Sequence, residues 1–270
     1  MKIDIRLEQP EDYRAVEELT REAFWGFMDH TTCDGEHLLV HKLRKLPAYI
    51  PELDFVAEVR GKLVGHVIYS RAKVVTPEGI EVEVINLGPI SVLPEYKRMG
   101  VGSALIRHSV AVAANQGYRA IIFYGHPDYY PRFGFCRASR YGITSGDGRS
   151  FDALMAMELY DGALAGINGR YIEDHVYNVD PEELAEFDKG FTYKEPVKLI
   201  PIERLINQLP ERARDAFYQQ KIKYVSGLLR FSGKEMLGWK GMDEQTLEKV
   251  NDILLELGQP RKYLWEGNHE

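Results

Sequence analysis

The order of patterns in the central part of the chain constrains the fold more than any other feature of the sequence. Residues 80–92 are apolar enough for a buried strand, and residues 120–124 predict another strand. Between them, residues 100–114 have the apolar spacing of a helix, which ends before Gly117. A strand, a helix and a second strand in this order predict a sheet with a helix packed on it.

The N-terminal part of the chain adds antiparallel and helical patterns. Residues 1–6 alternate like a strand, and residues 11–24 and 38–46 carry apolar side chains at helical spacing. Two strand-like runs then flank a turn at residues 60–62, which indicates a hairpin. An antiparallel start followed by a strand–helix–strand unit predicts an α+β or α/β fold, with a mixed sheet flanked by helices.

The character of the sequence changes near residues 180–196, which are charged, bounded by proline and poorly periodic. We therefore predict a first domain at residues 1–190, a linker at 191–200 and a small all-α domain at 201–262. The helices expected in the second domain are 201–209, 211–220, 224–230, 232–237 and 244–257.

Composition and charge argue against several classes of protein. The formal net charge is −7, with −8 on residues 1–195 and +1 on residues 196–270, so neither part is the basic surface of a strong nucleic-acid binder. We expect no signal peptide, and no apolar run approaches the roughly 20 residues of a membrane span. Cys33 and Cys136 lie far apart and predict neither a disulfide nor a metal site. We expect a cytoplasmic protein that binds neither DNA nor a membrane.

Residues 96–106, with the sequence YKRMGVGSALI, have the composition of an anion-binding turn. The start of a helix presents unpaired backbone N–H groups and the positive end of the helix dipole. The glycines at 100 and 102 let a ligand approach the backbone, Ser103 can add a hydroxyl, and Lys97 and Arg98 can neutralise charge. The spacing fits neither the P-loop nor the dinucleotide fingerprint. The alternative is an ordinary strand–helix turn without a ligand.

A different pattern in this segment resembles a known family. Lys97-x-x-Gly100-x-Gly102 is similar to the Q/R-x-x-G-x-G/A signature of the GNAT N-acetyltransferases, with lysine in place of glutamine or arginine. The preceding INLGPISVLPEYKR resembles the splayed strand of that family, and GHPDYYPRFGF, residues 125–135, resembles its tyrosine-containing segment. The likeness covers about residues 1–190 and points to the YhbS-like branch of uncharacterised acetyltransferases.

The resemblance implies a GNAT fold that uses acetyl-CoA as co-substrate. It implies that the loop cradles the pyrophosphate, that Val92 pairs with the pantetheine, and that the Ile90 amide faces the thioester carbonyl. It also implies that Tyr130 protonates the departing thiolate, although a packing role for this ring is the alternative. The implied cofactor-binding residues are Ile90, Val92, Lys97, Arg98, Met99, Gly100, Val101, Gly102 and Ser103, and the implied catalytic residue is Tyr130.

The sequence does not identify a general base. Some members of the family carry a glutamate on the strand before the loop, but the matching position here is Asn86, whose amide cannot accept a proton. Glu81 and Glu83 lie earlier on this strand and would share the face opposite to Asn86, where a solvated role is the alternative. His126 could act near neutral pH or only orient a loop. A water relay, or no base at all, also remains open.

The resemblance places the acceptor amine near residues 24–41 and Tyr129. An apolar cluster and three acids lie in this stretch, and the acids could attract a cationic amine. These residues are Phe24, Trp25, Phe27, Met28, Asp29, Asp34 and Glu36. The alternative is a helix end that packs on the core, followed by a solvated loop.

Residues 209–229 and 246–258 resemble the C-terminal domain of the bacterial RNA polymerase alpha subunit. The key arginine of that domain falls on Arg212, but Asp215 stands where that domain has asparagine. Residues 243–246, Asp-Glu-Gln-Thr, stand where it has a basic turn, and carboxylates repel a phosphate backbone. We expect the helical fold without DNA binding. Residues 201–262 would contact a protein partner, the first domain or a second copy.

Together these features predict an acetyl-CoA-dependent N-acetyltransferase that acts on a primary amine of an unidentified small molecule or protein. The alternative is an acyl-CoA-binding regulator with little catalysis, which works through its helical second domain.

Overall fold

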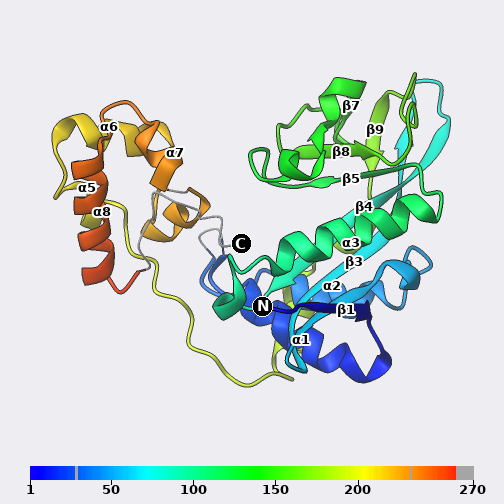
Figure 1. The fold of residues 1–270 in the computed structure, drawn as a ribbon, viewed down its shortest axis with the longest axis horizontal. Coiled ribbons are helices and arrows are strands. Elements are labelled where there is room, and N and C mark those ends of the chain that lie inside the picture. Colours follow the sequence, from blue (N-terminus) through cyan, green and yellow to red (C-terminus); the bar gives the residue numbers. More distant parts are fainter. Residues whose placement is uncertain (28–29, 232, 260–270) are drawn as a thin grey trace. The chain divides into compact units, whose positions relative to one another are not determined.

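The structure is a computed structural model that describes residues 1–27, 30–231 and 233–259. The chain forms two compact units (Figure 1). The first unit consists of Met1–Phe24 and Gly35–Tyr193, and the second of Trp25–Asp34 and Lys194–Glu270. No helix in the described part of the chain has the length and apolar character needed to cross a membrane.

The first unit is built on one mixed sheet, for which the described residues provide nine strands. The strands are β1 (Asp4–Leu7), β2 (Phe55–Val59), β3 (Lys62–Val75), β4 (Glu81–Val92), β5 (Ala120–Tyr124), β6 (Cys136–Arg137), β7 (Ile143–Thr144), β8 (Leu154–Glu158) and β9 (Gly169–Ile172). Their order is β1-β2-β3-β4-β5-β8-β6, while β9 joins β3 and β7. The β4–β5 and β7–β9 pairs are parallel, and the other pairs are antiparallel.

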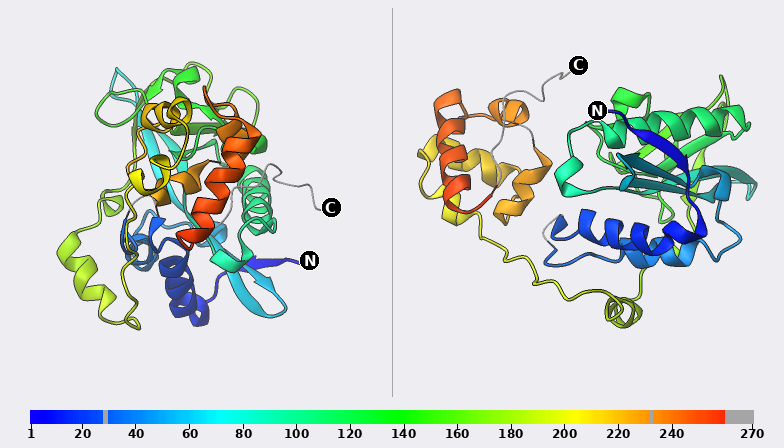
Figure 2. Two further views of the ribbon diagram at one scale, coloured as in Figure 1. Left: turned by 90° about the vertical axis from the view of Figure 1, so that its left-hand side faces the viewer. Right: turned by 60° about the horizontal axis from the view of Figure 1, so that its bottom comes forward.

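Helices cover both faces of this sheet (Figure 2). The α-helices of the first unit are α1 (Tyr13–Ala23), α2 (Glu36–Leu43), α3 (Val101–Asn115) and α4 (Pro181–Asp188), and its 3-10 helices are η1 (Pro10–Asp12), η3 (Pro51–Leu53), η4 (Pro94–Tyr96), η5 (Tyr130–Phe133), η6 (Ala138–Tyr141) and η7 (His175–Tyr177). Helix α3 packs on one face, and α1 and α2 pack on the other. The predicted mixed sheet flanked by helices is therefore confirmed, with β4, α3 and β5 as its strand–helix–strand unit.

Alternation along β3 builds a separate core on each face of the sheet. Val67 and Tyr69 are fully buried on the α3 face, and the Tyr69 hydroxyl lies 2.8 Å from the Ser109 hydroxyl of α3. Ile68, between them, is fully buried on the other face together with Val16 of α1. Because neighbouring side chains of a strand point to opposite faces, one long strand serves both helix layers.

The second unit is a set of short helices around an apolar core of its own. The helices are α5 (Glu203–Ile206), α6 (Glu211–Gln219), the 3-10 helix η8 (Val225–Arg230), α7 (Gly233–Leu237) and α8 (Glu244–Glu256). Phe217 is fully buried, and the Trp239 ring packs edge-on against it with 5.3 Å between ring centroids. Asp243 caps α8 by accepting hydrogen bonds from the backbone N–H and the hydroxyl of Thr246.

Residues Trp25–Asp34 belong to the second unit, although they interrupt the first unit in the sequence. The Val197 N–H donates a hydrogen bond to the Thr31 carbonyl at 2.7 Å. The Trp25 indole N–H donates to the Glu195 carbonyl at 3.3 Å. No pattern in the sequence indicated this grouping.

A close approach of two backbone segments makes the second unit sensitive to one glycine. Gly241 has a φ of +94°, and a Cβ at this position would lie 2.0 Å from the Arg212 carbonyl oxygen. We expect Gly241→Ala to lower the free energy of unfolding of this unit by about 3 kcal/mol or more. The cost of a left-handed backbone at a non-glycine residue adds to the cost of the clash between the new Cβ and the main chain. Urea unfolding followed by tryptophan fluorescence measures the change.

Gly258→Ala is the matched control for this prediction. Gly258 has a φ of +70° but open space around a Cβ, so only backbone strain of about 1–2 kcal/mol is expected. Equal losses of stability in the two variants would contradict the close approach at Gly241.

Candidate active site

The loop between η4 and α3 presents unpaired backbone amides. Gly100 is the N-cap residue of α3 with a left-handed φ of +86°, and no side chain caps the helix. Within the described chain, the following residues have backbone N–H groups without an acceptor: Arg98, Gly100, Val101, Gly102 and Ser103. Unpaired amides at the positive end of a helix dipole form a site for an anion. The loop is therefore suited to hold a phosphate group.

The side chains of this loop differ in what they contact. Val101 is 1% exposed and packs in the core, so only its backbone amide is available to an anion. The Lys97 ammonium donates a hydrogen bond to the Ala23 carbonyl at the end of α1 (3.0 Å), and burial around the ammonium lowers its pKa. Arg98 makes no ion pair within the described chain, and Met99 is exposed. Lys97 is thus engaged by the fold, and its role toward a phosphate stays a prediction.

Strands β4 and β5 part from each other after a single paired position, Ile85 with Ile121. Beyond it, β4 stays paired with β3, and β5 stays paired with β8 up to Tyr124 opposite Leu154. The edge of β4 that faces β5 is therefore left without a strand partner.

The space between the diverging strands β4 and β5 is called the parting here. The backbone amides of Ile90 and Val92 point into it. The Leu93 N–H donates to the Val64 carbonyl of β3. Successive peptide groups of a strand point to opposite sides, so the Ser91 N–H also points toward β3. The amides of Ile90 and Val92 then point away from β3, toward the side on which β5 departs. An extended ligand could pair with this edge as a strand would.

Tyr130 and Tyr129 lie close to the parting and the loop. The Tyr130 ring packs edge-on against Phe123 and Phe135, with 4.6 and 5.8 Å between ring centroids, in the core under α3. Burial raises the pKa of Tyr130, so its phenol stays protonated at neutral pH. Its hydroxyl has no hydrogen-bond partner within the described chain. The Tyr129 hydroxyl would lie 3.9 Å from a Cβ at Gly102, which places it beside the loop.

The bases considered from the sequence are engaged elsewhere. Their ion pairs are Glu81–Lys73 at 2.5 Å and Glu83–Arg71 at 2.9 Å. The β3–β4 register and the alternation of the strand place Glu81 and Glu83 on the face opposite to Asn86. His126 accepts a hydrogen bond from the Asp128 N–H at 3.3 Å, which braces its own loop.

A carboxylate that no sequence pattern indicated, Glu173, lies beside Asn86. The Asn86 amide is 3.4 Å from the nearer carboxylate oxygen of Glu173, 87 positions away in the sequence. The Tyr177 hydroxyl donates to the Gly88 carbonyl at 3.0 Å and lies 2.9 Å from the Ser70 hydroxyl. Burial raises the pKa of Glu173 to about 7. The structure thus brings a titratable carboxyl to the position where the sequence offered only an amide.

The stretch predicted to meet the acceptor is divided between the two units. Residues Trp25–Asp34 belong to the second unit, whereas Glu36 begins α2 of the first. Met28 and Asp29 lie outside the described residues. The Asp34 carboxylate lies 3.3 Å from the imidazole of His30. The assignment of this stretch to the acceptor stays a prediction.

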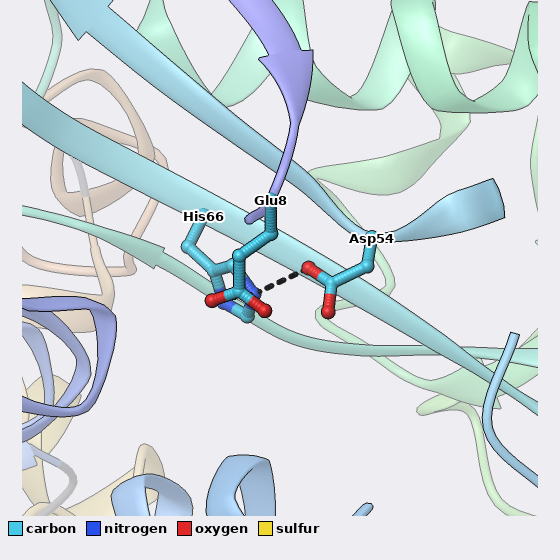
Figure 3. Close-up of side chains that lie close together, drawn as sticks. All are labelled: Glu8, Asp54 and His66. Atoms are coloured by element: carbon cyan, nitrogen blue, oxygen red, sulfur yellow. Dashed lines mark hydrogen bonds and ion pairs between the residues drawn. The ribbon is translucent and has the colours of Figure 1, made fainter. Parts of the chain in front are cut away.

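A second polar cluster, of Glu8, Asp54 and His66, is buried in the first unit (Figure 3). Two carboxylates and an imidazole this close could hold a metal ion. Here Asp54 lies 2.8 Å from His66 and accepts a hydrogen bond from Tyr49, while Arg44 donates to both Glu8 oxygens at 2.5 and 2.9 Å. Burial and the Asp54 charge raise the pKa of Glu8, and Arg44 opposes this rise. Because these donors occupy the oxygens that a cation would need, the residues fit a buried hydrogen-bond network rather than a metal centre.

The sequence of the first unit is similar to a known protein family and to two curated proteins. Residues 16–135 match the family described as Acetyltransferase (GNAT) family. The uncharacterized N-acetyltransferase YjhQ of Escherichia coli is 39% identical over 87 residues, which cover 32% of this chain and 46% of YjhQ. The chain therefore spans less than half the length of that relative. The uncharacterized N-acetyltransferase YhbS of Escherichia coli is 27% identical over 165 residues, 61% of this chain and 92% of YhbS.

Solved structures agree with this relationship. The crystal structure of YhbS from Escherichia coli in complex with CoA superposes with a TM-score of 0.58 at 27% identity, covering 66% of this chain and 93% of that one. A GNAT family acetyltransferase from Brucella melitensis in complex with acetyl-CoA gives a TM-score of 0.52 at 26% identity, covering 65% and 98%. The match of residues 16–135 includes the loop, the parting strands and Tyr130. The first unit of this chain therefore has the fold of the GNAT acetyltransferases, and residues 16–135 are similar in sequence to that family.

Proposed function

We propose that the protein is an acetyl-CoA-dependent N-acetyltransferase that acts on a primary amine of a small molecule or protein. The observation that carries this proposal is the row of unpaired amides at the start of α3, which follows the strand whose Ile90 and Val92 amides point into the parting. A pyrophosphate on the loop and a pantetheine along β4 together fit one extended acetyl-CoA molecule. The CoA and acetyl-CoA bound to the YhbS and Brucella structures support this assignment.

Two groups of the first unit share the chemistry: the Ile90 amide and the Tyr130 hydroxyl. A neutral amine nitrogen attacks the thioester carbonyl carbon, a C–N bond forms, and the Ile90 amide stabilises the negative charge on the oxygen. The C–S bond then breaks, and the Tyr130 hydroxyl, kept protonated by its raised pKa, gives a proton to the sulfur. The proton that the nitrogen loses balances the one that the sulfur gains, so the products are an amide and the CoA thiol.

Thermal unfolding of the whole protein tests the cofactor first. A ligand that binds only the native state stabilises it by about 2.7 kcal/mol at a hundred times its dissociation constant. We expect a saturable rise in Tm with acetyl-CoA and with CoA, and ADP serves as a probe of the phosphate site alone. A Tm that stays constant with all three ligands would contradict the cofactor assignment.

A charge placed at Gly102 tests the loop itself. Gly102 is the second residue of α3, where an added carboxylate favours the helix dipole but repels a pyrophosphate. We expect Gly102→Asp to bind CoA at least about tenfold more weakly, since like charges placed together cost several kcal/mol. The Tm of the free variant should not fall. Isothermal titration calorimetry with CoA gives the affinity.

Gly102→Ala is the control for this variant. An added Cβ there would make only ordinary contacts, 3.6 Å from the Val92 side chain and 3.9 Å from the Tyr129 hydroxyl. The alanine variant should therefore keep most of its affinity for CoA. Equal affinities of the aspartate variant and the wild type would show that no anion binds at this helix start.

Removal of the Tyr130 hydroxyl tests whether this residue is the general acid. We expect Tyr130→Phe to lower kcat by about 10²–10⁴-fold while the affinity for CoA stays nearly constant, because the ring still packs and only the proton donor is lost. Release of the CoA thiol with a panel of primary amines measures kcat. Tyr118→Phe removes a hydroxyl that bonds Glu52 instead and should keep its turnover. Unchanged turnover of Tyr130→Phe would assign this ring to packing alone.

We infer that the second unit contacts a protein partner or a second copy rather than DNA. Its likeness to the RNA polymerase alpha domain stays a prediction. Arg212, the position that this likeness singles out, forms an ion pair with the Asp243 carboxylate at the cap of α8. An arginine already neutralised by a carboxylate is a poor ligand for a phosphate backbone.

A further inference from the structure

Glu173 is a half-buried carboxylate without a cationic partner. Within the described chain, no lysine, arginine or histidine forms an ion pair with it, and the hydrogen bond it accepts comes from the Asn86 amide. By contrast, the buried carboxylates of Glu8 and Glu17 are both bonded to Arg44. Removing a carboxylate from water without a compensating charge is unfavourable. A cationic ligand would supply the compensating charge.

The sheet places Glu173 on the face covered by α1 and α2. Asn86 pairs with Ser70 in the β3–β4 ladder, so their side chains share one face. Val74, four residues along β3 from Ser70, lies on this face too and pairs with Tyr171 of β9. Glu173 follows Tyr171 by two residues and therefore points to the same side. Its hydrogen bond with Asn86 agrees with this placement.

This face adjoins the stretch of β4 at which the thioester is proposed to lie. The Tyr177 hydroxyl donates to the carbonyl of Gly88, two residues before Ile90. The Tyr177 hydroxyl also lies 2.9 Å from the Ser70 hydroxyl, and Ser70 pairs with Asn86, whose amide donates to Glu173. The Tyr130 ring packs on the opposite face, under α3. The carboxylate and the phenol therefore approach the parting from different sides.

We propose that Glu173 receives the acceptor as an ammonium ion and removes its proton, which rests on the function proposed above. An ammonium loses two protons when it becomes an amide. The first passes to the Glu173 carboxylate and on to water, which frees the lone pair that forms the C–N bond. The second leaves the tetrahedral intermediate and balances the proton that Tyr130 gives to the sulfur as the C–S bond breaks. Asn86 acts as a positioning residue that holds the carboxylate.

The groups around Glu173 suit this task. Burial raises the pKa of three tyrosines, and the charge of Glu173 adds to each rise: Tyr124, Tyr171 and Tyr177. Aromatic faces stabilise an ammonium ion. The other charged groups that act on these tyrosines are Asp147 and Arg149 at Tyr124 and Asp174 at Tyr177. A carboxyl whose pKa burial raises to about 7 is a base matched to neutral pH.

The test compares Glu173→Gln with Glu83→Gln, whose carboxylate is ion-paired with Arg71 on the other face. Release of the CoA thiol from saturating acetyl-CoA is followed from pH 6 to 9, with n-butylamine as the probe. The same assay without amine measures hydrolysis of acetyl-CoA, in which water is the acceptor. The wild-type rate should rise with pH through about 7, since the ionised carboxylate is the base. Glu173→Gln should lose two features of the wild type: the levelling of the rate above about pH 7, because its rate follows the neutral fraction of the amine instead, and about 10²-fold or more of the rate at pH 7. Glu83→Gln should retain both.

Acetyl-CoA binding separates failure of this inference from failure of the proposed function. Both variants should show the wild-type rise in Tm with acetyl-CoA. If they do, and Glu173→Gln keeps the wild-type rate and pH profile, Glu173 is not the base. If the wild type shows no rise in Tm, or releases no CoA beyond the rate in buffer, the proposed function and this inference fail together.

Stability gives a readout that does not depend on turnover. The pKa of Glu173 is higher in the folded protein than in the unfolded chain, so the carboxyl favours folding at low pH and loses this contribution as the pH rises through about 7. Glu173→Gln should therefore raise Tm relative to the wild type more at pH 8 than at pH 4.5. A Glu173 that serves only the fold would instead lower Tm when replaced, at both pH values.

Discussion

The separation of β4 from β5 is the constraint on which the rest of the first unit depends. Each strand is held by its other neighbour, β4 by β3 and β5 by β8, so they share only the pair Ile85 and Ile121. Backbone groups that a closed sheet would pair are left for a ligand. Helix α3 connects the two strands and begins at the same end of β4, which brings its unpaired amides to the same place. The unpaired backbone groups of the β4 edge are thus followed directly by the unpaired amides at the start of α3.

The two polar clusters of the first unit differ in how their charge is compensated. Around Glu8, Asp54 and His66, the Arg44 guanidinium bonds both Glu8 oxygens, and the Tyr49 hydroxyl and the His66 imidazole each contact one Asp54 oxygen. Such a network, in which the Nδ1 atom of His66 lacks a partner within the described chain, stabilises one arrangement of the elements that contribute to it. Among the described residues, Glu173 accepts only a long hydrogen bond from an amide, and its charge is costly whenever no cation is present. A protein that kept this carboxylate for stability alone would pair it as it pairs Glu8.

Much of the fold could be predicted from the sequence, and the donor site remains a prediction that rests on the same kind of local signal. The apolar runs of β4 and β5 and the glycines at the start of α3 are contiguous in the chain, and their physical consequences are local. The proposed base could not be predicted, since Glu173 reaches Asn86 through the pairing of β9 with β3, and no spacing records that pairing. The bond from Lys97 to the end of α1 is equally non-local. The sequence indicated which strand would carry the proposed site but not which distant segment would complete it.

The placement of Trp25–Asp34 in the second unit has a consequence for how such a protein can be taken apart. The polypeptide crosses between the units after Phe24, after Asp34 and again after Tyr193. A domain joined by one linker can be removed by a single cut in the chain. Here a single cut cannot separate the two units, because the second unit consists of two separate segments of the chain. A protein cut after Tyr193 would retain the whole sheet, but the connection between α1 and α2 would lose the main-chain partners that residues 195–197 provide. The helical unit is therefore not one continuous stretch of chain, because it includes a segment that lies between two parts of the first unit in the sequence.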